Sequence, residues 1–297
     1  MTTKHFLTLK DLPADDVLDI VRRAIALKKD PELATNQRRK TLGLVFEKAS
    51  TRTRIAFEVA MTQMGGYSLF ISSASSQLGR GEPIEDTARV LSRMVDCLAI
   101  RTFAHGNLEK FAEYSKVPII NALSDEFHPC QLLADVQTFI EHRGDIKGAN
   151  VAWVGDGNNM CQSYINAAEV FDFTLRIACP NGYEPDQALV DAHTERVTLS
   201  NDPLMAVKDA DLVVTDVWAS MGLEQEQQLR ETDFANFLVD HNLLSLAADD
   251  VVFMHCLPAH RGEEVSAELM EDSSSVVWDE AENRMHTQKA LLEYLLD

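Results

Sequence analysis

The chain has 297 residues, and its 27 lysines and arginines against 47 aspartates and glutamates give a formal net charge of −20. This length suits two domains better than a single core, and so acidic a composition argues against nucleic-acid or anionic-membrane partners, which require a basic face. The five cysteines are few and unclustered, which is typical of a reducing compartment and not of a disulfide framework or a zinc site. With no apolar run of membrane-spanning length and no signal sequence, we expect a cytoplasmic protein.

Strand-like and helix-like segments alternate along the chain. Several apolar runs are continuous, as in parallel strands covered on both faces, so the alternation predicts an α/β fold with mainly parallel sheets. Strands are predicted at 42–46, 67–71, 97–101, 117–121, 151–155, 174–179, 196–199, 211–216, 251–256 and 275–278. Helices are predicted at 54–64, 86–94, 108–115, 130–142, 159–171, 186–194 and 203–209, with a last helix from roughly 280 to 296.

A polar stretch at 141–150 is the best candidate for a linker. We therefore predict two α/β domains, at 1–140 and 148–280, each a mainly parallel sheet flanked by helices. The last helix, within 281–297, is expected to return to the first domain. In the first predicted helix, an apolar face is expected to include Ile55.

The segment STRTR, residues 50–54, places three hydroxyls and two guanidiniums side by side in a chain short of positive charge. It lies between a strand ending near Glu47 and a helix beginning near Arg52, where free backbone N–H groups and the helix dipole attract anions. The alternative is an ordinary N-cap, Ser50, followed by solvated arginines. The density of donors favours a phosphate site, although no Walker A loop is present.

Three further stretches hold candidate polar groups. His128 and Gln131 lie three residues apart at a predicted helix start, where both side chains can grip one small polar group. Asp216 ends a strand and could bind an amine, or cap a turn. Cys256 ends another strand beside His255 and could be a tuned thiol, although a structural cysteine is the commoner case.

The stretch VGDGNNM, 154–160, resembles a dinucleotide-binding turn but lacks its decisive features. Met160 stands where the third glycine belongs, and the next strand ends in Cys179-Pro180 and not in an acidic residue. We therefore expect no nicotinamide cofactor here, and no other cofactor.

Taken together, these motifs resemble the aspartate/ornithine carbamoyltransferase family, and in particular its ornithine branch. STRTR and HPxQ (128–131) belong to the wider family, whereas DVWASMG (216–222) and HCLP (255–258) single out the ornithine branch. The resemblance implies carbamoyl transfer from carbamoyl phosphate to the δ-amine of L-ornithine, giving L-citrulline. Both directions of metabolism, arginine synthesis and citrulline breakdown, stay open.

The resemblance also implies residue roles. The phosphate would be held by Ser50, Thr51, Arg52, Thr53 and Arg101, with Gln77 reaching in from a neighbouring subunit of a homotrimer. His128, Gln131 and Arg284 would contact the carbamoyl group, with Cys256 and the Leu257 carbonyl bordering it and facing the δ-amine. Ornithine would be held by Asn159, Asp216, Ser220 and Met221. The catalytic set is Arg52, Arg101, His128 and Cys256, and no metal is needed because basic residues stabilise the developing charge.

Two classes of alternative remain. A sibling transferase would use putrescine, an acylated ornithine or aspartate, which the intact DVWASMG and HCLP motifs disfavour. A catalytically inactive homologue would only bind a small anion, which the intact set of candidate catalytic residues disfavours.

Overall fold

The computed structural model describes residues 3–72, 77–219 and 226–297. The chain divides into two compact units. The first unit comprises Met1–Gln137 and Glu282–Asp297, and the second comprises Thr138–Ala281. Within the described part of the chain, no helix is long and apolar enough to cross a membrane.

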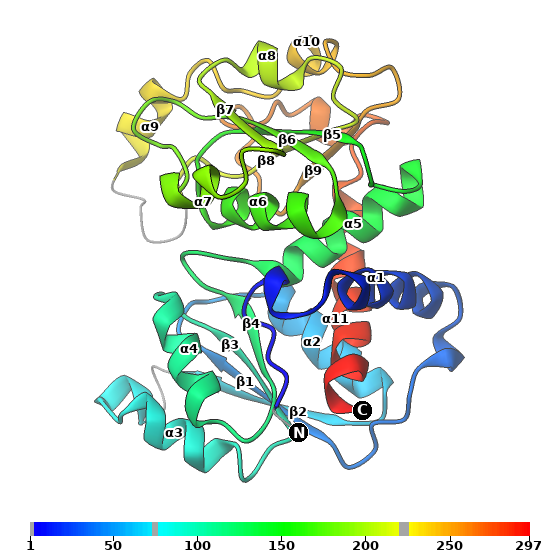
Figure 1. Cartoon of the computed structure of the whole chain (residues 1–297), viewed down its shortest axis with the longest axis vertical. Helices are drawn as coiled ribbons and strands as arrows, with labels where there is room; N and C mark the ends of the chain where they lie inside the picture. The colour runs from blue at the N-terminus through cyan, green and yellow to red at the C-terminus, as the bar shows by residue number, and fades with distance from the viewer. Residues whose placement is uncertain (1–2, 73–76, 220–225) are drawn as a thin grey trace. The chain divides into compact units, whose positions relative to one another are not determined.

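The first unit is built on a four-stranded parallel sheet with the order β2-β1-β3-β4. Helices α3 and α4 lie on one side of it, and α1, α2 and α11 on the other (Figure 1). Its strands are β1 (Thr41–Phe46), β2 (Tyr67–Ser72), β3 (Cys97–Arg101) and β4 (Ile119–Leu123). Its helices are α1 (Ala14–Lys29), α2 (Arg52–Gln63), α3 (Ile84–Leu91), α4 (His105–Tyr114) and parts of α5 (Pro129–Arg143) and α11 (Val277–Leu296).

The second unit is built on a five-stranded parallel sheet with the order β7-β6-β5-β8-β9. Helices α6 and α7 lie on one side of it, and α8 and α10 on the other (Figure 1). Its strands are β5 (Asn150–Val154), β6 (Thr174–Ala178), β7 (Val197–Ser200), β8 (Leu212–Thr215) and β9 (Val252–His255). Its helices are α6 (Asn159–Phe171), α7 (Gln187–Asp191), α8 (Pro203–Val207), α9 (Gln227–Asp233) and α10 (His241–Leu244).

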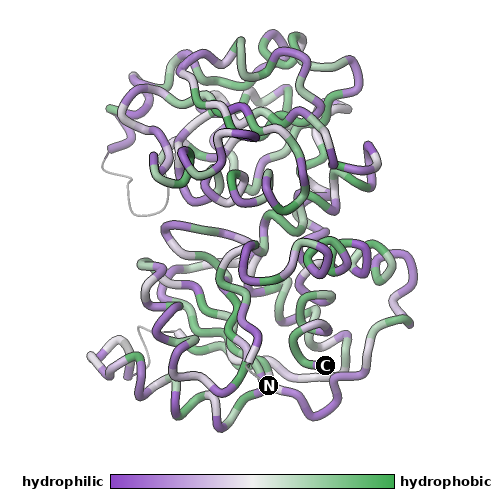
Figure 2. The backbone as a smooth tube through the Cα atoms, viewed as in Figure 1, coloured by the Kyte–Doolittle hydropathy of each residue, from purple (hydrophilic) through white to green (hydrophobic). Residues whose placement is uncertain are grey.

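The predicted α/β fold with parallel sheets is confirmed, and the structure corrects several local expectations. The strand predicted at 275–278 is wrong: only Ser275 bridges to β9, and α11 begins at Val277. The predicted linker, 141–150, is helical to Arg143. Helices α1, α9 and α10 were not predicted, although hydrophilic and hydrophobic residues alternate along α1 (Figure 2).

The apolar face predicted for α2 is also wrong in one respect. Ile55 is 53 % exposed, whereas Ala56 and Ala60 are buried together with Thr53 and Phe57. An exposed isoleucine on this helix leaves an apolar surface open beside the edge strand β2.

Candidate active site

In the first unit, the predicted phosphate-binding residues gather where the chain reverses its direction across the sheet. From β1 the chain moves outwards to β2, and from β3 it moves outwards the other way to β4. Open α/β sheets bind ligands at such a switch point, beyond the carboxyl ends of the strands. Phe46 pairs with Arg101 in register, so the segment 50–53, which leads into α2, and the end of β3 meet at this edge.

A buried row of hydrogen bonds crosses from α2 to α5 beside this edge. Arg284 of α11 donates from Nη2 to Thr53 Oγ1 at 2.8 Å and from Nη1 to Gln131 Oε1 at 2.5 Å. Gln131 Nε2 then donates to Asp135 Oδ1 at 2.9 Å. All four side chains are buried, so the row is shielded from water and its geometry is fixed.

Another predicted residue, His128, lies close enough to Arg284 and Arg101 for their charges to affect it. Burial lowers the pKa of His128 well below its usual value, and the positive charges of Arg284 and Arg101 lower it further. His128 is therefore neutral near pH 7 and can donate one ring N–H without adding charge. Arg101 is buried like His128, whereas Arg52 is exposed at the first position of α2.

The second unit repeats the switch-point arrangement with different chemistry. From β5 the chain moves to β6 and β7 on one side, and later segments form β8 and β9 on the other. Thr215 of β8 pairs with His255 of β9, so Asp216 and Cys256 are the next residues beyond both strands. The register thus brings these two predicted residues together at the carboxyl edge.

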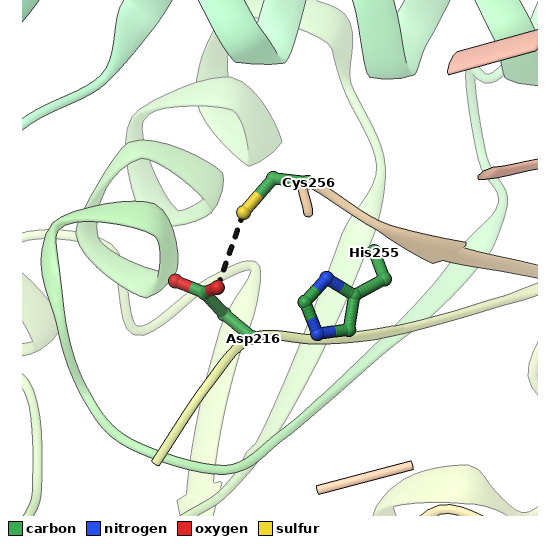
Figure 3. A group of neighbouring side chains, drawn as sticks. All are labelled: Asp216, His255 and Cys256. Carbon is green, nitrogen blue, oxygen red and sulfur yellow. Dashed lines mark hydrogen bonds between the residues drawn. The ribbon is translucent and has the colours of Figure 1, made fainter. Parts of the chain in front are cut away.

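Asp216 is the centre of a small acceptor network. Cys256 Sγ donates to Asp216 Oδ1 at 3.1 Å, as Figure 3 shows, and the Val217 N–H donates to the same oxygen at 2.8 Å. Asn158 Nδ2 donates to Asp216 Oδ2 at 2.9 Å, while its own carbonyl oxygen caps α6. The Cys256 thiol is therefore hydrogen-bonded to a carboxylate.

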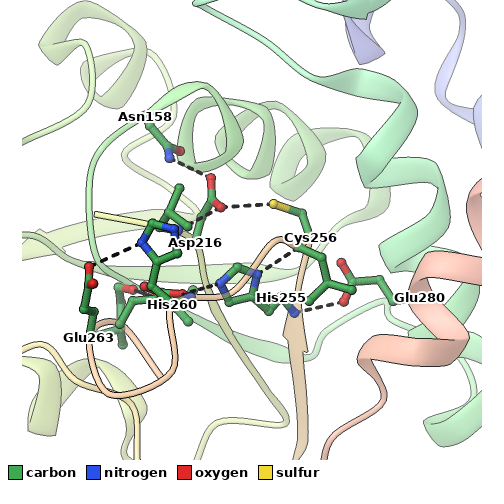
Figure 4. A network of polar contacts seen from close by, with 12 residues as sticks. Asn158, Asp216, His255, Cys256, His260, Glu263 and Glu280 are labelled. Carbon is green, nitrogen blue, oxygen red and sulfur yellow. Dashed lines mark hydrogen bonds and ion pairs between the residues drawn. The ribbon is translucent and has the colours of Figure 1, made fainter. Parts of the chain in front are cut away.

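The His255 side chain bonds to Leu257 and Glu264 and not to Asp216. Its Nδ1 accepts the Leu257 N–H at 2.9 Å, and its Nε2 lies 2.9 Å from Oε1 of the fully buried Glu264. Because a backbone amide can only donate, the ring proton resides on Nε2 and is donated to Glu264. Figure 4 shows this network from Asp216 and Cys256 to His255 and Glu280. The Glu280 carboxylate accepts from the backbone N–H of His255. His255 thus holds the turn after β9.

A buried ion pair lies next to the Asp216 network. Arg230 of α9 donates from Nη1 to Asp156 Oδ2 at 3.0 Å and to the Trp218 carbonyl at 2.5 Å. Burial raises the pKa of Asp156 to about 6, although Arg230 acts in the opposite direction. The pair joins the turn after β5 to the segment after β8, the two turns that flank the switch point.

The Gly-x-Gly of this turn has a packing explanation. A Cβ on Gly157 would lie 2.2 Å from Pro185 N and 2.4 Å from Glu184 C, both backbone atoms. Only glycine fits against that backbone. The glycine that suggested a dinucleotide therefore serves the packing of the chain on itself.

Two groups of side chains within the described residues could in principle offer ligands to a metal ion. Asp216, His255 and Cys256 place one ligand atom each within 4.8 Å of one another, as do His260, Glu263 and Glu264. In the first group both ring nitrogens of His255 are engaged by Leu257 and Glu264. A metal would have to displace a buried hydrogen bond, so this donor set fits an internal network better than a metal centre.

Comparison with known proteins decides the family. The sequence model described as "Aspartate/ornithine carbamoyltransferase, carbamoyl-P binding domain" matches residues 4–141, and that described as "Asp/Orn binding domain" matches residues 147–295. The chain belongs to the aspartate/ornithine carbamoyltransferase family. The predicted resemblance is thereby confirmed, and the candidate sites at the two switch points fall within the two family domains.

Individual carbamoyltransferases resemble the chain along its whole length. An ornithine carbamoyltransferase of Nitrosococcus oceani is 62 % identical over 299 residues, covering 100 % of this chain and 98 % of that protein. One of Methylococcus capsulatus is 61 % identical, with 100 % and 99 % covered. The solved ornithine carbamoyltransferase of Pyrococcus furiosus is 45 % identical with a TM-score of 0.93, covering 98 % of this chain and 96 % of that one.

Within the described residues, the structure brings some of the predicted site residues together and leaves others apart. Thr53, Arg101, His128, Gln131 and Arg284 come together in the first unit. Asp216, Cys256 and Leu257 come together in the second. Gln77 is exposed after β2. Ser220 and Met221 lie outside the described residues.

Sequence reasoning missed several residues that form hydrogen bonds at or beside the candidate site. Asn158, which was not among the predicted residues, donates to Asp216. Its preference for capping a helix start was a usable signal. Asp135 lies four residues after Gln131, a spacing that brings side chains together on a helix, and this too could have been read. Nothing in the sequence pairs Asp156 with Arg230, which lie 74 residues apart.

Proposed function

We propose that the chain transfers the carbamoyl group of carbamoyl phosphate to the δ-amine of L-ornithine, giving L-citrulline and phosphate. The observation that carries the proposal is the buried Thr53–Arg284–Gln131 row at the switch point of the unit matched by the carbamoyl-phosphate-binding family domain. Full-length relatives that carry the name ornithine carbamoyltransferase support the choice of acceptor.

On the donor side, we assign the phosphate to Ser50, Thr51, Arg52, Thr53 and Arg101. As the amine attacks, negative charge grows on the carbamoyl oxygen. Arg52, Arg101 and the neutral His128 would donate to that oxygen, and a well-placed donor of this kind is worth about 3–4 kcal/mol of transition-state stabilisation. The first turn of α2 and the arginines would then neutralise the departing phosphate.

On the acceptor side, we assign the α-amino and α-carboxylate groups of ornithine to Asn159, Asp216, Ser220 and Met221. The new C–N bond forms as the C–O bond to phosphate breaks, and the amine must lose a proton. Cys256 would relay that proton, because its thiol already donates to Asp216 and can pass its own proton there.

Citrulline formation tests this proposal directly. Purified protein should form citrulline from carbamoyl phosphate and ornithine, and no carbamoylated product from putrescine, acetylornithine or aspartate. A preference for one of those acceptors would replace ornithine in the proposal. Phosphate binding without turnover of any acceptor would favour an inactive anion-binding homologue.

We further propose a cytoplasmic enzyme of arginine biosynthesis. A relative from Pseudomonas savastanoi pv. phaseolicola, 57 % identical along the whole chain, is named an anabolic ornithine carbamoyltransferase. Ornithine and carbamoyl phosphate are small metabolites, and no other partner is required for the reaction.

We also propose that the chain forms a homotrimer, and an apolar surface on the first unit supports self-association. Tyr67, Leu69 and Phe70 of the edge strand β2 are 71 %, 53 % and 38 % exposed, and Ile55 of the neighbouring α2 is 53 % exposed. Arg54 of α2 stacks on Phe70 at 3.8 Å, so these residues belong to adjoining elements. Exposed edges and apolar patches of this kind are usually covered by a partner.

If Gln77 of one subunit completes the phosphate site of the next, two inactive variants should complement each other. Gln77→Ala and Arg52→Ala proteins should each be nearly inactive. Refolding them together should restore activity, up to one intact site per trimer, wherever one chain supplies Arg52 and its neighbour supplies Gln77. A mixture as inactive as its parents, despite demonstrated subunit exchange, would confine Gln77 to its own chain.

A further inference from the structure

Asp135 is a buried carboxylate of the first unit to which the roles above assign nothing. It lies on α5, four residues after Gln131, and is 1 % exposed. Its Oδ1 accepts from Gln131 Nε2 at 2.9 Å. A carboxylate is rarely buried so completely unless its hydrogen bonds repay the cost of removing it from water.

The partners of Gln131 have opposite polarity, and together they fix which way its amide points. Arg284 has only donors, so the group that faces it at 2.5 Å must be the carbonyl oxygen of Gln131. The NH₂ group must then face Asp135, which has to accept there. Rotating the amide by half a turn would oppose donor to donor on one side and acceptor to acceptor on the other.

The result is that Gln131 turns an acceptor towards Arg284, whose other terminal nitrogen donates to Thr53 of the predicted phosphate-binding segment. A carbonyl oxygen accepts up to two hydrogen bonds, so the oxygen that binds Arg284 can also accept from a ligand N–H. It cannot donate, and it gains nothing from a methyl group. Size cannot replace this distinction, because an amino group and a methyl group differ little in volume.

We propose that Asp135 is a positioning residue for substrate selection: by fixing the Gln131 amide, it makes the site prefer an acyl phosphate that carries an N–H donor over one that carries a methyl group in the same place. The inference rests on the proposed function, because it takes Gln131 as the group that meets the carbamoyl nitrogen. A site built to hydrogen-bond a group rejects the analogue that lacks it far more strongly than an apolar pocket rejects a change in size.

Two stable phosphonates that differ only at this position test the proposal. Phosphonoacetamide carries the NH₂ group, and 2-oxopropylphosphonate carries a methyl group instead. We expect calorimetry on the full-length protein to show that the wild type prefers the amide by roughly tenfold or more, the effect of one buried hydrogen bond. Asp135→Ala should lower that preference to within about threefold while leaving the affinity for inorganic phosphate unchanged.

Conservative and distinguishing variants complete the design. Asp135→Asn retains an oxygen that can accept from Gln131 and should restore the preference, whereas a purely structural role would weaken both phosphonates and inorganic phosphate together. If Asp135→Ala does not fold, Asp135→Ser answers the same question, because its hydroxyl is one bond too short to reach Gln131. An unchanged preference in folded Asp135→Ala or Asp135→Ser overturns the proposal, as does a loss in Asp135→Asn equal to that in Asp135→Ala.

Gln131→Met separates this inference from the function on which it rests. It matches the shape of glutamine but has no amide, so the preference should disappear. If Gln131→Met keeps the wild-type preference, or the wild type shows none, Gln131 does not read the carbamoyl nitrogen and the site assignment fails, whatever Asp135 does. If Gln131→Met loses the preference but folded Asp135→Ala keeps it, the assignment stands and only the role of Asp135 is refuted.

Discussion

The two units place opposite chemistry at the same point of the same kind of sheet. In the first unit, the switch point between β1 and β3 is lined by guanidiniums, a neutral imidazole and a helix N-terminus. In the second, the switch point between β5 and β8 presents the carboxylate of Asp216 with a thiol and an amide bonded to it. One edge suits an anion and the other suits an amine.

This contrast explains how a chain of net charge −20 can bind a phosphate. Buried side chains feel close neighbours much more strongly than distant surface charges, which solvent and salt screen. Burial lowers the pKa of His128, and the nearby charges of Arg284 and Arg101 lower it further in spite of the overall acidity. The local arrangement of charges, and not the net charge, therefore decides which ligand each unit accepts.

The largest effect is expected from a variant that impairs only the donor half, by which we mean the predicted carbamoyl-phosphate site of the first unit. Arg52→Ala should abolish measurable carbamoyl phosphate binding and lower kcat by a factor of about 10²–10³, the usual cost of one transition-state donor. The fold should survive, because Arg52 is exposed at a helix start. Calorimetry measures the loss of binding, and thermal unfolding measures whether the fold survives.

Arg54→Ala is the matched control for that change. Arg54 lies two residues further along α2, where it pairs with Glu58 at 2.9 Å and stacks on Phe70. The Arg54→Ala protein should bind carbamoyl phosphate with wild-type affinity. Wild-type binding by a folded Arg52→Ala protein would refute the assignment of the phosphate to this segment.

A somewhat smaller effect is expected from a variant that impairs only the acceptor half, the predicted ornithine site of the second unit. Cys256→Ala removes the thiol bonded to Asp216, so KM for ornithine should rise and kcat should fall by about 10²-fold, the lower range for a lost proton-transfer group. Affinity for carbamoyl phosphate should change little. A purely structural cysteine would instead give a lower melting temperature with unchanged kinetics per folded molecule.

Much of the fold could be predicted because its signals are local. The strand runs and the start of α2 near Arg52 follow from apolar patterns and turn residues within a few positions. The strand expected at 275–278 failed because β-branched valines favour a strand locally, yet Val277 is buried as the start of α11. There the tertiary environment overrides local propensity.

The site was predictable only where a motif already carried its chemistry. His128, Gln131, Asp216 and Cys256 stand out beside strand ends and helix starts. Their partners do not: whether Asn158 or Asn159 faces Asp216 depends on the capping geometry of α6. Likewise, the commitment of His255 to Glu264 depends on how the chain folds back after β9.

A smaller effect, on stability, is expected when the buried ion pair of the second unit is broken, and it should exceed the effect of breaking an exposed pair of the first unit. Arg230→Met leaves Asp156 buried without its partner, so the free energy of unfolding should fall by about 3–5 kcal/mol. Arg89→Met breaks an exposed pair and should cost less than about 1 kcal/mol. Adding Asp156→Asn to Arg230→Met should recover part of the loss. Equal losses in the two single variants would refute the distinction.

The smallest effect concerns how pH acts on this same pair. Burial raises the pKa of Asp156 to about 6 from 3.8, so between these values the folded chain binds a proton that the unfolded chain releases. This contribution to stability is fully present below pH 4 and is lost as the pH rises through 6. The free energy of unfolding of the wild type, relative to that of Asp156→Asn, should therefore fall by at most about 3 kcal/mol over this range and stay level above it.

Tryptophan fluorescence can follow the unfolding of the second unit, which contains Asp156, at each pH. All three tryptophans, Trp153, Trp218 and Trp278, belong to the second unit, so urea unfolding followed by their emission at several pH values measures the unit that contains Asp156. A matched titration of Asp156→Asn removes the contribution of every other titrating group. A difference that rises with pH would mean that the charge of Arg230 outweighs burial at Asp156. The acceptor half would then stabilise a charged carboxylate at this position, and its contrast with the neutral His128 of the donor half would be sharper than burial alone implies.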